Sequence, residues 1–280
     1  MKFKLYRQHG ALNSPALFDA FDQGLKKIGH VVSDDTDSIP VIWSVLWHGR
    51  MKPNQQIYNN HRIKGIPVVI IEVGNFHRGK TWRISVNNVN GLGYFGEGAV
   101  DRDRPKKIQV DMKSPNHRRR SEVLIACQHR HSLQWPENMS IESWVSSTVD
   151  EIAACSDRKI VVRPHPRCPI NLAHKRVTVN HPRKLAASYD DYDFDHQYHA
   201  VINYNTGPAI QAALNGTPVV CDQSALAYPI SDVLSNIENP QLKDRESWMI
   251  DLCHKEWTVD EISAGVPQSR LSPFLETEIS

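Results

Sequence analysis

The chain has 280 residues, of which 40% are hydrophobic and 23% charged, an ordinary composition for a globular protein that buries its own core. Its net charge of +2 excludes the strongly basic composition of a dedicated polyanion binder. No apolar run approaches the ~20 residues of a membrane span, and none of the five cysteines forms a CxxC pair, so neither a membrane helix nor a zinc or disulfide framework is indicated. The chain starts in a polar, strand-like stretch without a signal-peptide core, so we expect a cytoplasmic protein with buried, reduced thiols.

The first half of the chain alternates strand and helix patterns. Nearly continuous apolar runs at residues 41–47 and 68–72 are typical of central parallel strands that are covered on both faces. Ser14 followed by Pro15 is a good helix start, because proline fits the first helical turn. We predict strands at residues 2–6, 31–32, 41–47 and 68–72, and helices at residues 14–28 and 55–64.

The second half begins a similar series after a different stretch. Residues 83–111 are rich in Asn and Gly and indicate loops and short strands near a lobe boundary. The predicted strands that follow are residues 123–127, 159–163, 199–203 and 218–221, and the predicted helices are residues 141–154, 209–214, 242–253 and 259–265. This alternation indicates an α/β fold with two Rossmann-like halves that divide near residue 120.

The strongest local signal is VVRPHPR, residues 161–167, in which an apolar strand runs into a turn stiffened by two prolines. Ligands of open α/β sheets bind beyond the carboxyl ends of the strands. Arg163 offers phosphate a forked contact, and His165 offers a hydrogen bond or a proton. A rigid turn whose arginines only face water is the less favoured interpretation.

A second polar turn follows the predicted strand at residues 199–203. Asn205, Thr206 and Gly207 precede a helix, whose free N–H groups and dipole favour an anion. Taken singly, Asn205 and Thr206 would cap that helix in any case. Two anion-favouring turns in one half of the chain predict a site for a phosphorylated ligand.

Polar residues also end the following strand. Asp222 and Gln223 stand after the strand at residues 218–221. They could reach a ribose, a base or a sugar hydroxyl, or they could form another cap, and the two interpretations are equally good.

The first half offers candidates for proton transfer. His48 and Arg50 follow one predicted strand, and Glu72 ends the next. Glu72 or His48 could act as a general base that removes a proton from an attacking hydroxyl. A buried ion pair of Glu72 with Arg50 or Arg78 is an equally good interpretation.

Two charged clusters remain. Residues 190–195, DDYDFD, precede a strand and have no His or Cys partner at metal-ligand spacing, so we predict a solvated loop and no tightly bound metal. Residues 101–107 and 117–120 concentrate positive charge in mid-chain. On charge alone they are solvated loops, and a patch that faces phosphates is the functional alternative.

In chain order, VLWHGR, GIPVVIIEVGN, WRISVNNVNGLG, VVRPHPR, NYNTGPAIQAALNGTPVV and LCHKEWTVDEISAG resemble GT-B glycosyltransferases of bacteriophages, which are distantly similar to capsule-polysaccharide transferases. The resemblance runs over residues 41–265. It implies an acceptor lobe at residues 1–120, a nucleotide-sugar donor lobe at residues 121–240, a cleft between the lobes, and helices at residues 241–280 that cross back to the first lobe.

The resemblance also implies roles for single residues. Glu72, with His48 as the other candidate, would be the catalytic base. The donor, most simply a UDP-sugar, would be held without a tightly bound cofactor or metal, since basic residues and a helix dipole stabilise the departing nucleotide. The chain has Asn205 and Thr206 where similar sequences often place Ser directly after the strand's Asn. The implied donor-binding residues are Arg163, His165, Arg167, Asn203, Asn205, Thr206, Gly207, Asp222 and Gln223.

Three functions compete at this stage. In a phage setting the acceptor would be a hydroxymethylated pyrimidine, such as hydroxymethylcytosine, flipped out of double-stranded DNA. A glycan or lipid-linked saccharide is the alternative acceptor, and no basic amphipathic helix indicates a membrane partner. A binding module for nucleotide sugars or nucleic acid, without turnover, is the non-enzymatic alternative. The implied acceptor-binding residues are Arg50, Asn87, Asn90, Arg118, Arg119 and Arg120.

Overall fold

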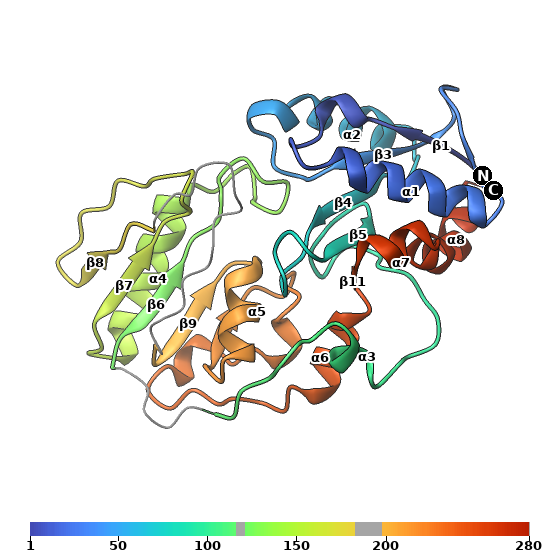
Figure 1. Ribbon diagram of the computed structural model, residues 1–280. Helices are drawn as coiled ribbons and strands as arrows, with labels where there is room; N and C mark the ends of the chain where they lie inside the picture. The colour runs from blue at the N-terminus through green and yellow to red at the C-terminus, as the bar shows by residue number, and fades with distance from the viewer. Residues whose placement is uncertain (116–120, 183–197, 280) are drawn as a thin grey trace. The chain divides into compact units, whose positions relative to one another are not determined.

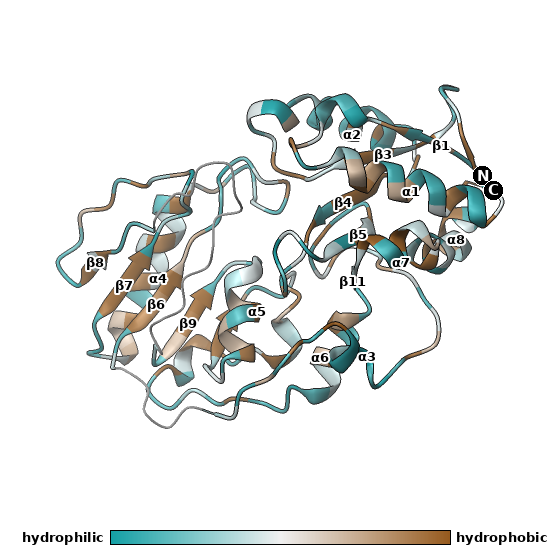
Figure 2. Ribbon diagram, in the orientation of Figure 1, coloured by the Kyte–Doolittle hydropathy of each residue, from teal (hydrophilic) through white to brown (hydrophobic). Residues whose placement is uncertain are grey.

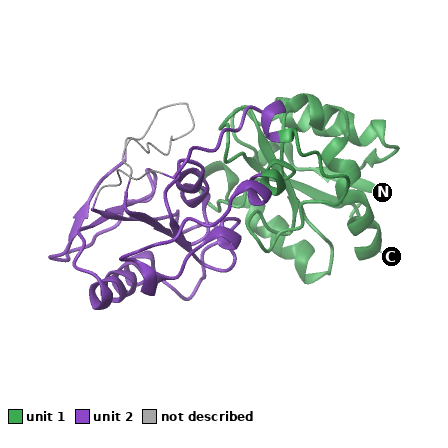
Figure 3. Cartoon of the chain, turned by 90° about the horizontal axis from the view of Figure 1, so that it is seen from below, with its two compact units in different colours: residues 1–104, 250–280 green, residues 105–249 purple. Residues whose placement is uncertain are grey.

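The computed structural model describes residues 1–115, 121–182 and 198–279, which form two compact units (Figure 3). Unit 1 combines Met1–Arg104 with Ile250–Ser280, and unit 2 is Pro105–Met249. The sequence pattern put the divisions near residues 120 and 241. The observed divisions fall inside two helices, α3 (Arg104–Lys107) and α6 (Glu246–Cys253), where no loop composition marks them.

Unit 1 is built on a six-stranded sheet in the order β11-β5-β4-β3-β1-β2 (Figure 1). Strands β2, β1, β3 and β4 run parallel, whereas β5 is antiparallel to both of its neighbours, β4 and β11. Strand β3 is fully buried, as its apolar run predicted, but it ends at Trp43 because Ser44 has a left-handed backbone with φ of 62°. The strands are β1 (Lys2–Leu5), β2 (Val31–Val32), β3 (Ile39–Trp43), β4 (Val69–Val73), β5 (Trp82–Val86) and β11 (Glu256–Trp257).

The C-terminal helices of unit 1 pack against its first helix. Gln268 is buried, and its Nε2 donates to the carbonyl oxygens of Phe21 and Ile262. Gly24 allows this close approach, since a Cβ there would lie 2.2 Å from the Ile262 oxygen. The chain beyond residue 250 is therefore an integral part of unit 1. The helices of this unit are α1 (Pro15–Lys27), α2 (Pro53–Ile63), α7 (Val259–Ser263) and α8 (Val266–Glu278).

Unit 2 contains a five-stranded sheet in the order β10-β9-β6-β7-β8, with every pair parallel. Figure 2 shows the hydrophobic character of β6, β7 and β9, which agrees with their complete burial. Helix α4 (Ile141–Cys155) contributes Val145, Val149 and Ile152 to the same core. The remaining elements are β6 (Val123–Ala126), β7 (Ile160–Arg163), β8 (Val177–Val179), β9 (Ala200–Asn203), β10 (Val219–Cys221) and α5 (Gly207–Leu214).

The structure also contains short 3-10 segments and five cysteines. The 3-10 segments are Arg7–His9, Gly49–Met51, Tyr228–Ile230 and Leu234–Asn236. All five cysteines are free thiols, but Cys155 is exposed and Cys221 is half-buried, so the expectation of buried thiols is wrong for these two residues. In the described part of the chain, no helix has the length and apolar character needed to cross a membrane.

Candidate active site

The strand order of unit 2 indicates where its sheet would bind a ligand. If β6 is counted as strand 1, the order β8-β7-β6-β9-β10 is the Rossmann order 3-2-1-4-5. From β6 the chain first adds β7 and β8 on one side and then β9 and β10 on the other, so the strand order reverses between β6 and β9. Ligands of such sheets bind outside the carboxyl ends of the strands at this switch point. Ala126, the last residue of β6, is in register with Arg163 on one side and with Asn203 on the other. The two polar turns predicted from the sequence therefore flank the switch point.

The turn after β7 is closely built around His165. Its Nδ1 accepts the Arg167 N–H at 3.1 Å, and its carbonyl oxygen accepts the Cys168 N–H at 2.9 Å. In the neutral ring the proton therefore resides on Nε2, which makes that nitrogen a donor. Arg163 is 8% exposed at the end of β7, whereas Arg167 is exposed. The turn thus fixes a histidine next to a buried arginine at the carboxyl edge.

The turn after β9 differs from the predicted cap. Asn203 Oδ1 accepts the Thr206 N–H at 2.6 Å, and Asn203 Nδ2 donates to Thr206 Oγ1 at 2.8 Å. Asn205 Nδ2 instead donates to Ser224 Oγ and the Gln134 oxygen. Thr206 stands at the N-cap position of α5, but its side chain makes no capping hydrogen bond, so the alternative interpretation of Thr206 as a side-chain cap does not hold. The helix N-terminus, which begins at Gly207, keeps its capacity for an anion.

The turn after β10 is tied to the turn after β9. Asp222 Oδ1 accepts from both the N–H and the hydroxyl of Ser224, and Ser224 Oγ in turn accepts from Asn205. Asp222 is half-buried and Gln223 is exposed. Asp222 therefore braces the Asn205 turn, and Gln223 extends from the same edge.

Two residues at the switch point itself were not predicted from the sequence. Gln128 and His129 follow β6 and are 2% and 4% exposed. Gln128 Oε1 accepts the Asn205 N–H at 3.4 Å, and the His129 ring lies edge-on to the His165 ring with centroids 5.2 Å apart. The signal was available, because both residues directly follow a predicted strand, as the turn that contains His165 does.

Burial raises the pKa of Cys127, which precedes Gln128, to about 12, so its thiol stays protonated at neutral pH.

In unit 1 the carboxyl ends of β3 and β4 bring Ser44 and Glu72 together. The Ser44 hydroxyl donates to Glu72 Oε2 at 2.7 Å, and the Val73 N–H donates to Glu72 Oε1 at 2.9 Å. Glu72 is half-buried, and within the described residues it forms no ion pair with Arg50 or Arg78. The described residues therefore do not show the ion pair of Glu72 with Arg50 or Arg78.

The other predicted residues of unit 1 lie in different surroundings. His48 and Arg50 are exposed beyond β3. Asn87 lies beside Val68 at the amino end of β4, opposite to the end that carries Glu72, and its Oδ1 accepts the Val68 N–H. Asn90 is buried, with its Oδ1 accepting the Leu92 N–H. The structure thus does not bring Asn87 to Glu72, and Arg118, Arg119 and Arg120 lie outside the described residues.

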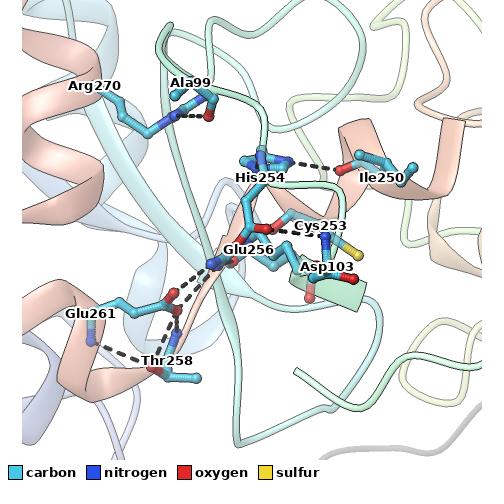
Figure 4. Close-up of polar contacts among 11 residues, drawn as sticks. Ala99, Asp103, Ile250, Cys253, His254, Glu256, Thr258, Glu261 and Arg270 are labelled. Atoms are coloured by element: carbon cyan, nitrogen blue, oxygen red, sulfur yellow. Dashed lines mark hydrogen bonds and ion pairs between the residues drawn. The ribbon is translucent and has the colours of Figure 1, made fainter. Parts of the chain in front are cut away.

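The predicted basic segment at residues 101–107 contains one inward-facing arginine. Arg104 is buried, contacts the Trp257 ring face at 4.3 Å, and donates to the carbonyl oxygens of Cys253 and Glu256. It also pairs with Glu261, whose carboxylate accepts the Thr258 N–H in a capping box (Figure 4). Burial acts to raise the pKa of Glu261, but the Arg104 hydrogen bonds hold it below its ordinary value. Arg104 is therefore committed to the interior of unit 1.

Glu256 organises the chain that follows β4. Its carboxylate is 1% exposed and accepts from the Asn75 N–H at 2.5 Å, the Phe76 N–H at 3.2 Å and the Thr81 hydroxyl at 2.9 Å. A residue from β11 thereby fixes the loop next to Glu72. Among the described residues no group of three or more His, Cys, Asp or Glu side chains could hold a metal, and residues 190–195 lie outside them.

Comparison with known proteins defines the fold. No protein-family model and no curated protein matches the chain. The chain is similar to KpsC of Thermosulfurimonas dismutans, a β Kdo 2,7 transferase, with a TM-score of 0.51 and 11% identity over 96% of this chain and 99% of that one. A β Kdo 2,4 transferase structure of KpsC from the same organism gives a TM-score of 0.46 at 11% identity, over 91% and 96% of the two chains. AviGT4, a glycosyltransferase involved in avilamycin A biosynthesis, gives 0.32 at 11% identity, over 99% and 97%. The first likeness, together with the two parallel-rich sheets, shows a GT-B-like α/β fold.

Proposed function

We propose that this protein is a glycosyltransferase that moves a sugar from a nucleotide-sugar donor to a hydroxyl acceptor. The observation that carries the proposal is the carboxyl edge of the unit 2 sheet. There a buried arginine, a fixed histidine and the N-terminus of α5, at which the Thr206 side chain makes no capping bond, flank the switch point between β6 and β9. Cationic groups and helix N–H groups together favour a phosphorylated ligand.

Donor binding is assigned to unit 2. Arg163, His165 and Arg167 supply charge and hydrogen bonds to the donor phosphates, and Asn205, Thr206 and Gly207 supply the turn at the N-terminus of α5. Asn203 holds that turn through its two contacts with Thr206. Asp222 and Gln223 supply polar contacts to the nucleoside or the sugar.

Acceptor activation is assigned to unit 1. Glu72 is the general base, which takes the proton of the acceptor hydroxyl as that oxygen forms its bond to the anomeric carbon. The bond from the anomeric carbon to the donor phosphate oxygen breaks in the same reaction, and its electron pair leaves with the nucleotide. His48 is the second candidate for the base.

The acceptor is proposed as a hydroxyl group, in either a saccharide or a hydroxymethylated pyrimidine of DNA. The name of the similar KpsC structure, a Kdo transferase, supports sugar chemistry and favours a saccharide. For DNA, the basic side chains of unit 1 provide less than the sequence suggested, because Arg104 is buried. Both acceptor classes therefore enter the test.

A transfer assay tests the proposal. Purified protein is incubated with UDP-, GDP-, CMP- and dTDP-sugars and, in separate reactions, with oligosaccharides or hydroxymethylated duplex DNA, and products are identified by mass spectrometry. We expect addition of one sugar with one donor, and a fall in kcat of roughly 10²–10⁴-fold in Glu72→Gln, because a general base contributes that much. Glu97→Gln, an exposed carboxylate of the same unit, is the matched control. Donor binding without product on either acceptor would leave the protein a binding module.

A further inference from the structure

Ser44 stands next to the proposed base in an unusual backbone conformation. Its φ of 62° lies in the left-handed region, which glycine and asparagine enter readily and other residues seldom do. The residue is 4% exposed, and its N–H donates to the Ile71 oxygen at 2.8 Å, so the strained conformation is held within the sheet. Such outliers at the ends of strands are typical of functional positions.

The side chain of Ser44 has a fixed direction. Its Oγ accepts the Leu46 N–H at 3.2 Å, and its hydroxyl donates to Glu72 Oε2 at 2.7 Å. Because the oxygen is engaged by Leu46, the hydroxyl proton is directed to the carboxylate. The Val73 N–H holds the other carboxylate oxygen, so the two donors together set the plane of the carboxyl group.

We infer that Ser44 is a positioning residue for catalysis, which orients the Glu72 carboxylate toward the acceptor hydroxyl. The inference rests on the proposed function of Glu72. Ser44 keeps its own proton throughout, and the acceptor proton goes to Glu72. A glycine would suit the backbone better, but only a side chain with a donor can hold Glu72 Oε2.

The left-handed backbone of residue 44 favours glycine, whereas the proposed positioning of Glu72 requires a side chain with a hydrogen-bond donor. A substitution can therefore affect stability and kcat in opposite directions. Ser44→Gly removes the hydroxyl and relieves the left-handed strain. We expect its melting temperature to equal or exceed that of the wild type, its KM for the donor to be unchanged, and its kcat to fall roughly tenfold to hundredfold, the effect of one hydrogen bond to a charged group. Ser44→Asn, which also suits the backbone and retains an N–H donor, should recover part of the lost kcat.

A double-mutant cycle with Glu72→Gln separates positioning from a structural role. In the Glu72→Gln background, Ser44→Gly should lower kcat no further, because the group that it positions is already disabled. An equal fall in both backgrounds would overturn the inference, as would a lower melting temperature with unchanged kcat. If the wild type transfers sugar and Ser44→Gly matches it, only the role of Ser44 fails. A wild type that transfers no sugar overturns the proposed function and this inference together.

Discussion

Both ring nitrogens of His254 are used inside unit 1. Nδ1 donates to the Ile250 carbonyl oxygen at 2.8 Å (Figure 4). Nε2 accepts the Asp101 N–H at 3.0 Å. The ring is 8% exposed and neutral in this arrangement, since an acceptor nitrogen carries no proton. A single protonation would therefore remove the contact with Asp101.

This residue predicts how stability depends on pH. Burial, the largest influence, lowers the pKa of His254 below its ordinary 6.5. The unfolded chain therefore binds the proton first, so the stability contributed by neutral His254 is present above pH 6.5 and is lost as pH falls through the lowered pKa. Between about pH 8 and about pH 5.5, the urea midpoint of the wild type should fall more than that of His254→Gln.

The comparison isolates His254 because His30, whose pKa burial also lowers, is present in both proteins. An identical pH dependence in the two proteins would show that His254 does not carry the effect.

At the scale of elements, Arg104 joins α3 to β11 and α7. Its guanidinium contacts three backbone or side-chain acceptors and the Trp257 ring, although the sequence presents it as one of several basic residues in a loop. The sequence pattern does not distinguish Arg104 from its basic neighbours, because its partners lie about 150 residues further along the chain.

Substitution of Arg104 should therefore strongly lower the free energy of unfolding. Arg104→Ala leaves the Glu261 carboxylate without its cationic partner and removes the guanidinium donor of two carbonyl oxygens, and breaking a buried pair in this way costs ~3–5 kcal/mol of unfolding free energy. Arg102→Ala, an exposed neighbour, should change it by less than about 0.5 kcal/mol. Urea unfolding of both variants measures the difference, and similar losses in the two would refute the assigned role of Arg104.

The central strands were predictable because burial on both faces produces continuous apolar runs, as in β4, β6 and β7. Strands β8 and β11 were not predicted, because β8 is not fully buried and β11 consists of one glutamate and one tryptophan, so neither contains a continuous apolar run. The turns at Arg163 and Asn203 could be predicted from the strands that precede them. The contacts within those turns could not, because Asn205 bonds to Ser224 and Gln134 rather than to its own helix.

At the scale of the whole molecule, each unit presents polar groups at the carboxyl ends of its own parallel strands. In unit 2 these are Arg163, His165 and the turn before α5, and in unit 1 they are Ser44 and Glu72. In the proposed function, donor binding is assigned to unit 2 and proton removal to unit 1. Substitutions of Arg163 or His165 should therefore change donor affinity, and substitutions of Glu72 or Ser44 should change kcat.

Calorimetric titration of nucleotides and nucleotide sugars into the wild type, Arg163→Ala and Lys175→Ala tests for a donor site at the carboxyl edge of unit 2. Lys175 is an exposed cation near the amino end of β8, away from the proposed site. We predict that one nucleotide class binds the wild type, that Arg163→Ala weakens it by ~1–3 kcal/mol, and that Lys175→Ala binds as the wild type does. Absence of binding to every nucleotide, or equal affinities in the two variants, would contradict a donor site at the carboxyl edge of unit 2.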